Sequence, residues 1–372
     1  MSGSAAASTP VPLWATAHRV LAVRLDNLGD VLMTTPALRA LHAALPGRHI
    51  TLLTSPGGVA VAPFVPEIDT VVVADTPWMP DGNATPEAVA ATVDLLRRGH
   101  YDAVVIFTVY SQNPLPAALL CWLAGIPLSL AHCRENPYRL LSHWVPEPEP
   151  HEMVRHEVRR QLDLVASVGA VTDDERLSFR LPPGAREAAA ARLQAVGIDP
   201  GRRWIVLHPG ASAASRRYAP EQFAAVAELL GAWPDCQLVF TGDRVESGLV
   251  DTIRGGLHRS VASLAGVLDL GQLAAVIAGA ALLVANNTGP VHIAAALGTP
   301  VVDIYALTNP QHAPWQVPHR VVYHDVPCRF CYRSVCPQSH HNCLHLLDPQ
   351  RVAGAARELL DAGADRWPAV PA

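Results

Sequence analysis

Short apolar runs that alternate with helix-like segments constrain the fold of this 372-residue chain more than any other feature. Eight runs rich in aliphatic and β-branched residues predict strands, at 19–25, 49–54, 70–74, 103–108, 204–208, 237–241, 281–285 and 300–305. Helix-like segments lie between many of them, at 30–45, 86–98, 220–230, 269–278 and 290–297. Strands that are apolar throughout and alternate with helices are typical of parallel sheets covered on both faces. The pattern predicts an α/β protein.

The length predicts two domains, since a domain typically takes about 150 residues. The middle of the chain lacks a clear strand and indicates two helices, around 152–169 and 184–196. We therefore expect two α/β domains separated near residue 180. The expected boundaries are a flexible N-terminal tail at 1–18, an N-terminal domain at 19–180, a C-terminal domain at 181–348 that contains a cysteine-rich segment at 328–343, and a C-terminal helix and tail at 349–372.

Composition excludes several classes of function. The chain has no lysine, which removes both a Walker A phosphate loop and a lysine Schiff-base mechanism. Its formal net charge is −5, so no broad basic field indicates nucleic-acid binding. The first 17 residues lack the cationic start and continuous apolar segment of a signal peptide, which predicts a cytoplasmic protein.

Two uncharged stretches, 103–133 and 270–302, have the length of membrane spans. Polar turn residues interrupt both, and a turn inside a bilayer would leave backbone groups without hydrogen bonds. We expect a strand, a loop and a helix of a soluble fold in each. Within the first stretch, the apolar run at 115–130 predicts a buried helix in preference to a membrane-docking surface.

The segment Leu25-Asp26-Asn27-Leu28-Gly29-Asp30 follows the first predicted strand. The carboxyl end of a strand in an open parallel sheet borders the ligand crevice. Gly29 would let the backbone approach a ligand closely, and Asp30 would serve either as a general base or only as a helix cap. The segment has no G-x-G-x-x-G fingerprint, so a nicotinamide or flavin site is not expected there.

Two further segments have the chemistry of phosphate binding. The loop His208-Pro209-Gly210-Ala211-Ser212 frees backbone N–H groups, and Arg216 or Arg217 downstream could hold a diphosphate. The alternative is a surface loop with two solvated arginines. In Asn286-Asn287-Thr288-Gly289-Pro290-Val291-His292, the Thr suits a cap and the Pro suits a first helical turn, so phosphate could bind at the helix N-terminus. His292 would either contact phosphate or pack in the core.

The segment Cys328-x2-Cys331-x4-Cys336-x6-Cys343 gathers four of the seven cysteines. Without a secretory signal a disulfide framework is not expected. The first pair has a spacing common at tetrahedral metal sites. Two interpretations remain open: a structural zinc or iron held by Cys328, Cys331, Cys336 and Cys343, or four reduced thiols that pack a loop.

Together these segments resemble glycosyltransferase family 9, the heptosyltransferases of lipopolysaccharide core assembly. The resemblance covers about residues 19–360. Its carriers are Arg24 to Asp30 with Pro36 downstream, His208 to Ser212, Arg216 to Phe223, Thr241-Gly242-Asp243, Asn287 to His292, and the cysteine-rich block followed by Asp348 to Val352. It implies a GT-B fold, with two Rossmann-like domains facing across a cleft. The N-terminal domain would be on the acceptor side, and the C-terminal domain would bind the nucleotide-sugar.

The resemblance also implies an activity: transfer of a sugar, heptose above all, from an ADP-activated donor to a glycan or lipid-linked, lipopolysaccharide-core-like acceptor. The reaction would invert the anomeric carbon and need no metal, at a cytoplasmic location that could include contact with the inner membrane surface. Asp30 falls on the position of the catalytic base. The implied donor-site residues are Gly29, Ser212, Arg216, Gly242, Glu246, Asn287, Thr288, Gly289 and His292.

This chain departs from the family pattern at three positions. Asn287 replaces a frequent aspartate, Arg216 a usual lysine and Tyr218 a usual tryptophan. Two alternatives to a transferase stay open on the sequence: a nucleotide-sugar 2-epimerase of the same architecture, and a non-catalytic metal-binding protein built on the cysteine cluster.

Overall fold

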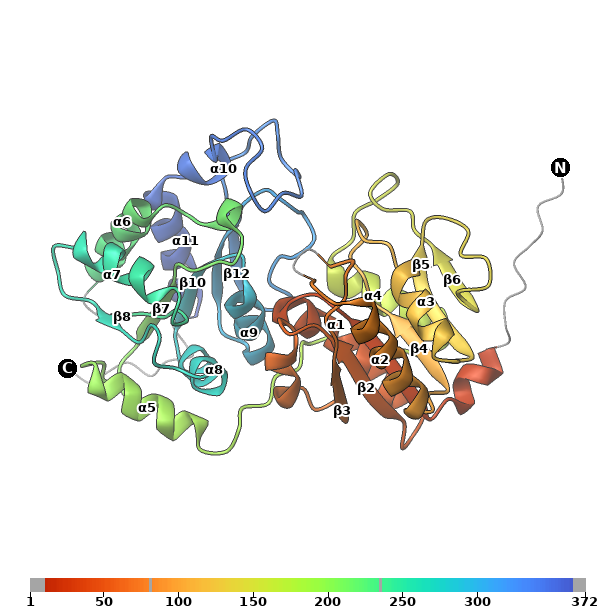
Figure 1. The fold of residues 1–372 in the computed structure, drawn as a ribbon. Helices are drawn as coiled ribbons and strands as arrows, with labels where there is room; N and C mark the ends of the chain where they lie inside the picture. The colour runs from red at the N-terminus through yellow and green to blue at the C-terminus, as the bar shows by residue number, and fades with distance from the viewer. Residues whose placement is uncertain (1–10, 80–81, 234–235, 364–372) are drawn as a thin grey trace. The chain divides into compact units, whose positions relative to one another are not determined.

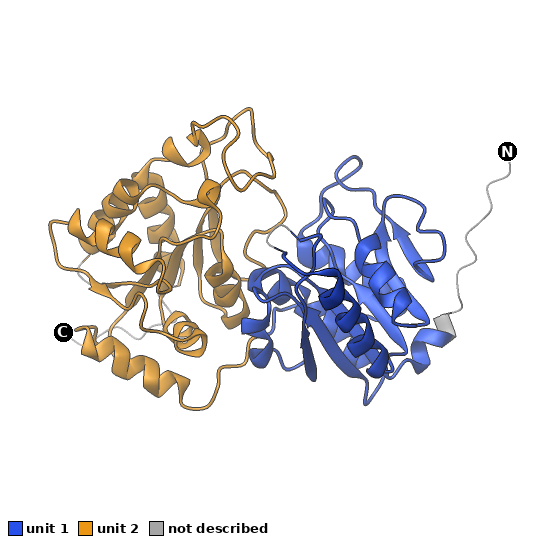
Figure 2. Cartoon of the chain, viewed as in Figure 1, with its two compact units in different colours: residues 1–178 blue, residues 179–372 orange. Residues whose placement is uncertain are grey.

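The computed structural model describes residues 11–79, 82–233 and 236–363. Most of the expected N-terminal tail and the last nine residues of the expected C-terminal tail lie outside these ranges. The chain divides into two compact units, residues 1–178 and 179–372 (Figure 2). Each unit contains one six-stranded parallel sheet with helices packed against it (Figure 1).

The sheet of the first unit has the strand order β3-β2-β1-β4-β5-β6, and every neighbouring pair is parallel. Its strands are β1 Arg19–Arg24, β2 His49–Thr54, β3 Thr70–Val73, β4 Ala103–Ile106, β5 Leu128–Cys133 and β6 His143–Pro146. Its helices are η1 Val11–Thr16, α1 Leu28–Ala44, η2 Val59–Phe64, α2 Pro86–Arg98, α3 Leu115–Leu123 and α4 Glu157–Ala166.

The sheet of the second unit has the order β12-β11-β10-β7-β8-β9, again parallel throughout. Its strands are β7 Trp204–His208, β8 Gln237–Phe240, β9 Ala262–Ser263, β10 Leu282–Asn286, β11 Val301–Ile304 and β12 His319–Val322. Its helices are α5 Ala185–Ala195, η3 Ala214–Arg216, α6 Pro220–Gly231, α7 Ser247–Gly255, α8 Leu270–Ala278, α9 Gly289–Leu297, α10 Asn342–His345 and α11 Pro349–Ala362.

Helix boundaries follow local capping chemistry. The Thr85 side chain accepts a hydrogen bond from the Ala88 N–H at the start of α2, and Asp269 forms a reciprocal capping box with Gln272 at α8. These contacts satisfy backbone donors that lack a partner in the first helical turn. In each sheet the chain runs outward in both directions from its first strand, so β1/β4 and β7/β10 flank the points where ligands bind in open α/β sheets.

The fold-class prediction is confirmed, and the eight predicted strands form close to their predicted bounds. β5, β6, β9 and β12 were not predicted. The expected helix at 115–130 is wrong: α3 ends at Leu123, and Gly125, with φ +80°, turns the chain into β5. Because α3 leaves Leu119, Trp122 and Leu123 about half exposed, it is also not a fully buried helix.

None of the helices within residues 11–79, 82–233 and 236–363 has the length and hydropathy to cross a membrane.

Candidate functional site

A buried arginine organises the carboxyl end of β1. The Arg24 guanidinium is fully buried, and its nitrogens reach three carboxylates: Asp26 at 3.0 Å, Asp30 at 3.2 Å and Glu157 at 2.8 Å. Asp26 follows β1, Asp30 lies in the first turn of α1, and Glu157 begins α4. One guanidinium therefore holds in place the acid that the sequence marks as a candidate base.

The charges in this cluster are unequal, with three carboxylates around one cation. Burial works against the charge on Arg24, but Asp26, Glu157 and Asp30 raise its pKa above the usual value. Burial raises the pKa of Asp26 to about 6; Arg24 opposes this rise and Asp30 adds to it. Asp26 also accepts a hydrogen bond of 2.6 Å from the Gln112 side-chain amide. Three carboxylates thus share one guanidinium, and burial favours the protonated form of Asp26.

Asp30 has a capping role as well. Its Oδ2 accepts a hydrogen bond of 3.3 Å from the Asn27 N–H, as in a capping box, while Oδ1 faces Arg24. Asp30 therefore does help to cap α1, and its role as a base stays a prediction. The Asp30 side chain remains 18% exposed, so its carboxylate is still reachable from solvent. Gly29 is buried beside it in the same turn.

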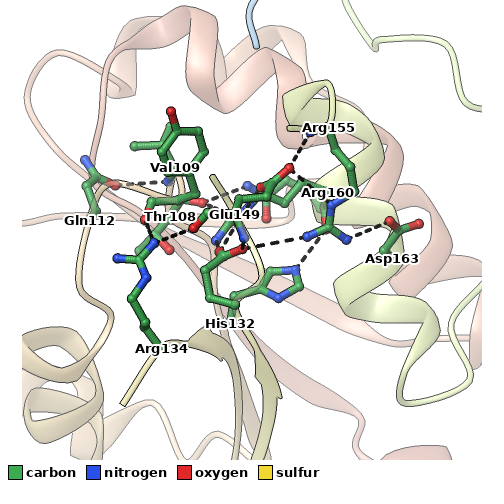
Figure 3. A network of polar contacts seen from close by, with 12 residues as sticks. Thr108, Val109, Gln112, His132, Arg134, Glu149, Arg155, Arg160 and Asp163 are labelled. Atoms are coloured by element: carbon green, nitrogen blue, oxygen red, sulfur yellow. Dashed lines mark hydrogen bonds and ion pairs between the residues drawn. The ribbon is translucent and has the colours of Figure 1, made fainter. Parts of the chain in front are cut away.

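A second buried network fixes the loop after β4 (Figure 3). The Arg160 guanidinium on α4 pairs with Glu147 and Glu149 and donates to the Thr108 carbonyl. Burial and the Arg160 charge lower the pKa of His132 on β5 to about 4, so this imidazole is neutral near pH 7. The network holds loop residues 108–112 in place, and Gln112 at the end of this loop donates a hydrogen bond to Asp26. No sequence motif predicted the network.

In the second unit, three polar residues meet at the ends of β10 and β11. The Asn287 side-chain amide donates to Asp303 Oδ2 at 2.9 Å and to the His312 carbonyl at 2.9 Å. Burial raises the pKa of Asp303 to about 8, although the Asn287 hydrogen bond and the Arg216 charge oppose the rise. Asp303 is thus hydrogen-bonded to Asn287 and lies within the electrostatic influence of Arg216. Asp303 was not predicted, since its signal is a single acid inside an apolar strand.

Arg216 and Arg217 have different surroundings. The Arg217 side chain donates to the carbonyls of Ala211 and Ser212, at 2.7 and 3.4 Å, so it braces its own loop. Arg216 is half-buried at the end of η3, and its charge opposes the rise in the pKa of Asp303 on β11. Ser215, which precedes Arg216, anchors η3: its N–H donates to the Ser334 carbonyl at 3.0 Å and its hydroxyl to the Arg333 carbonyl at 2.7 Å.

Glu246 fills the space at the ends of β7 and β8. Its Oε2 accepts a hydrogen bond from the Asp243 N–H at 2.9 Å and lies 3.5 Å from Nε2 of His208. A Cβ on Gly210 would lie 1.8 Å from Glu246 Oε1, so any other residue there would force the Glu246 carboxylate to move. Gly242 faces the same side chain: a Cβ at this position would lie 3.1 Å from Glu246 Cβ. Burial lowers the pKa of His208. The sequence indicated this residue only as the first of the predicted phosphate-binding loop, with no role of its own.

Helix α9 begins where the sequence places it. Thr288 occupies the N-cap position without a capping hydrogen bond from its side chain, Gly289 begins the helix and Pro290 lies in its first turn. His292 is buried at 4% exposure, and Ser212 is exposed. All predicted donor residues except Gly29 therefore lie in the second unit, most of them at the carboxyl edge of its sheet.

The predicted four-thiolate metal site is not formed. Cys328, Cys331, Cys336 and Cys343 are all free and line one small cavity of about 20 Å³. However, no group of three or more His, Cys, Asp or Glu side chains within the described ranges is arranged to hold a metal ion. The segment contacts the loop that carries Arg216 through Ser215, and it contacts the loop after β11, where the Phe330 and Tyr332 N–H groups donate to the Leu307 and Thr308 carbonyls at 2.6 and 2.8 Å.

Comparison with known proteins gives one consistent family. The model of glycosyltransferase family 9 (heptosyltransferase) matches residues 89–341. Lipopolysaccharide heptosyltransferase 1 of Pseudomonas aeruginosa is 25% identical over 361 residues, which cover 92% of this chain and 98% of that protein. Lipooligosaccharide heptosyltransferase 2 of Campylobacter jejuni is 31% identical over 166 residues, which cover 43% of this chain and 52% of that protein.

Solved structures share the fold. The glycosyltransferase of family 9 from Veillonella parvula superposes with a TM-score of 0.77 at 23% identity, covering 93% of this chain and 98% of that one. The ADP-heptose lipopolysaccharide heptosyltransferase II of Escherichia coli superposes with a TM-score of 0.72 at 21% identity, covering 93% and 99%.

Proposed function

The chain belongs to glycosyltransferase family 9, and from that premise we propose that it transfers heptose from an ADP-activated donor to a hydroxyl group of a lipopolysaccharide-core-type acceptor, with inversion. The names of its relatives support the choice of sugar and acceptor, since they are lipopolysaccharide and lipooligosaccharide heptosyltransferases. The ADP-activated donor is supported by the name of the Escherichia coli protein of similar fold, an ADP-heptose heptosyltransferase.

One observation carries the donor half of the proposal: Asn287 donates a hydrogen bond of 2.9 Å to the buried Asp303 beside the N-terminus of α9, and the charge of Arg216 acts on the same acid. In the proposed complex the donor diphosphate contacts Arg216 and the N–H groups of the first turn of α9. Such groups favour anions, because the first turn has unpaired donors and the positive end of the helix dipole. The same groups would stabilise the charge that develops on departing ADP.

Glu246 and its neighbours would bind the nucleoside end of the donor. The carboxylate is 19% exposed at the sheet edge and fixed by the Asp243 N–H, so it can accept hydrogen bonds from ribose hydroxyls. Gly210 and Gly242 leave room for it. Ser212 is a further donor-site candidate, exposed on the neighbouring loop.

Asp30 would act as the general base. In the proposed step its carboxylate takes the proton from the acceptor hydroxyl as that oxygen forms a bond to the anomeric carbon. The bond from this carbon to the phosphate oxygen breaks at the same time, and ADP leaves with the electron pair. Attack on the face opposite ADP gives inversion. Arg24 keeps the carboxylate oriented, which supports this role.

We further propose that the enzyme works at the cytoplasmic face of a membrane, where lipid-linked acceptors are presented. Cys328, Cys331, Cys336 and Cys343 form no disulfide in the structure, which suits a reducing compartment. Leu119, Trp122 and Leu123 on α3 and Leu95 on α2 are about half exposed, near the cationic end of α2. Cosedimentation with anionic vesicles tests this contact: Trp122→Ala should reduce binding, and equal binding would exclude α3.

A donor screen tests the main proposal. Thermal unfolding would be followed with ADP-heptose and with ADP-, UDP-, GDP- and TDP-hexoses, since a ligand that binds the folded state raises its apparent stability. We expect the largest shift with ADP-heptose, and release of ADP once a core oligosaccharide is added. A larger shift with another nucleotide would contradict the donor assignment. Epimerisation of the donor without any acceptor would contradict the transferase assignment.

A further inference from the structure

Glu157 is a fully buried acid to which the reaction proposed above gives no role. It is the first residue of α4. Its Oε1 accepts a hydrogen bond of 2.8 Å from Nη1 of Arg24 and a second one from the side-chain amide of Gln161, one turn further along α4. A buried acid is costly unless donors compensate it, and these two donors hold Glu157 in one place beside the guanidinium.

Three features of this position favour the ionised form of Glu157 against its burial. The Arg24 guanidinium, which keeps its charge in proteins, lies at ion-pair distance. The Gln161 amide donates to the same oxygen. The first turn of a helix also favours a negative charge, because its N–H groups have no partner within the helix and lie at the positive end of the dipole. Glu157 therefore faces Arg24 as a carboxylate.

Arg24 turns a different nitrogen toward each of three acids. Nη1 faces Glu157, Nε lies 3.0 Å from Asp26, and Nη2 lies 3.2 Å from Asp30. An arginine that contacted Asp30 alone would favour its ionised form more strongly and make it a weaker base. A further carboxylate on the same guanidinium offsets part of the positive charge and reduces that effect. The basicity of Asp30 thus depends on an acid that belongs to another helix.

The elements packed on α1 bring few other charges to this end of the helix. η2 has no ionisable residue, and His49 of β2 pairs in register with Arg19, at the opposite end of β1 from Arg24. His156, the N-cap of α4, is a further titratable group beside Glu157. The other charged residues of α1 and α4 have ion-pair partners elsewhere or lie in the last turn: Arg39 with Glu67, Arg159 with Glu175, Arg160 with Glu147 and Glu149, Asp163 with Arg155, and His42 at the end of α1.

We propose that Glu157 is a positioning residue for the base: it orients the Arg24 guanidinium toward Asp30 and offsets its charge, so that Asp30 is a stronger base than a simple ion pair with arginine would allow. This inference rests on the proposed transferase function. A buried ion cluster is not needed for stability alone, since apolar residues of similar volume often stabilise a protein as well. The burial of Glu157 against Arg24 therefore suits a role beyond stability.

An NMR titration of the Asp30 carboxyl carbon in the full-length protein, labelled with ¹³C aspartate, tests the proposal without substrate. The signal is assigned by its absence in Asp30→Asn. Glu157→Gln keeps the shape of the side chain, and its carbonyl oxygen can accept both hydrogen bonds, so the fold should hold. We expect the titration midpoint of Asp30 to move about one pH unit lower, as for the loss of a neighbouring negative charge.

The pH dependence of heptose transfer gives a second readout. In Glu157→Gln the acidic limb of the kcat profile should move to lower pH, and kcat on the plateau should fall by up to about tenfold, because the base is weaker. KM for ADP-heptose should stay the same, since the proposed donor groups lie in the second unit. Glu157→Asp restores the negative charge and should return the limb toward its wild-type position, which a loss of packing alone would not explain.

Glu67→Gln is the matched control. Glu67 is also a largely buried acid of the first unit that pairs with an arginine of α1, but its partner is Arg39, at 3.0 Å, two turns beyond Asp30. This variant removes a comparable ion pair and should leave the titration midpoint of Asp30 unchanged.

Each outcome decides one claim. A midpoint in Glu157→Gln within about 0.2 pH units of wild type, or a higher one, overturns the role of Glu157 even when the enzyme transfers heptose normally. Failure of the wild type to bind or use ADP-heptose overturns the proposed function instead, and the titration still measures the coupling. If Glu157→Gln does not fold, ¹³C-labelled glutamate in the wild type decides: a Glu157 that keeps its proton where Asp30 titrates overturns the inference, and one already ionised there supports it.

Discussion

Replacing Asp26 by Asn should stabilise the protein at neutral pH, although it removes an ion pair. Asp26 shares the Arg24 guanidinium with Asp30 and Glu157. Burial raises its pKa from 3.8 to about 6. At about 1.4 kcal/mol per pKa unit, ionised Asp26 costs the folded state on the order of 3 kcal/mol. Asn resembles the protonated form in shape and avoids that cost.

The pH dependence fixes the sign of this effect. Below the unfolded pKa of 3.8 both states hold the proton and Asp26 costs nothing. Between 3.8 and about 6 the unfolded chain releases the proton first, so stability falls as the pH rises. Above about pH 6 the full cost applies. The advantage of Asp26→Asn should therefore grow across this window and then stay constant.

Urea unfolding between pH 4 and 8, with hydrogen exchange of peptides that cover β1, measures the effect and assigns it to the first unit. Asp94→Asn, an exposed aspartate on α2 of the same unit, is the matched control and should show no comparable trend. If wild type and Asp26→Asn give parallel curves over the whole range, the assignment of a strained, ionised Asp26 is wrong.

Three other variants test the remaining contacts. Arg24→Met should cost about 3–5 kcal/mol in urea unfolding, because it leaves the fully buried Glu157 without its cation; a loss below about 1 kcal/mol would refute this role for the cluster. Arg216→Ala should weaken ADP-heptose binding by about 10- to 100-fold in calorimetry, as for a lost charge-assisted hydrogen bond, whereas Arg217→Ala, which only braces its loop, should change it far less. Ser215→Ala removes the hydrogen bond that ties η3 to the Arg333 carbonyl, a loss of about 1 kcal/mol. Because Arg216 would then be held less firmly, the donor Kd should rise several-fold. An unchanged Kd would show that the cysteine-rich segment does not position Arg216.

The sheets were predictable because most of their strands are continuous apolar runs flanked by turn residues. The strands that were missed lack that signal. β6 and β12 are short edge strands with half-exposed residues. β5 is buried, but only Gly125 and its neighbours separate it from the apolar residues of α3, so the two merge into one run in the sequence.

The candidate site was predictable only where local motifs mark it. Asp30 lies after β1 in the first turn of α1. Thr288 and Gly289 lie after β10, at the start of α9 in the second unit. Their partners were not predictable, because the contacts join distant positions: Arg24 meets Glu157 across 133 residues of sequence. Such a pairing depends on how α4 packs on α1, which no local pattern encodes.

The most direct test of the central claim is the single-turnover rate of heptose transfer from ADP-heptose to a core oligosaccharide in Asp30→Asn, with ADP affinity measured on the same protein. We expect the rate to fall by about 10²–10⁴-fold, the usual contribution of a general base. ADP affinity should be unchanged, because Arg216, Glu246 and the first turn of α9, which we propose to hold ADP, lie in the other unit. A rate within about threefold of wild type would contradict the account, since a residue that removes the acceptor proton cannot be lost at so small a cost.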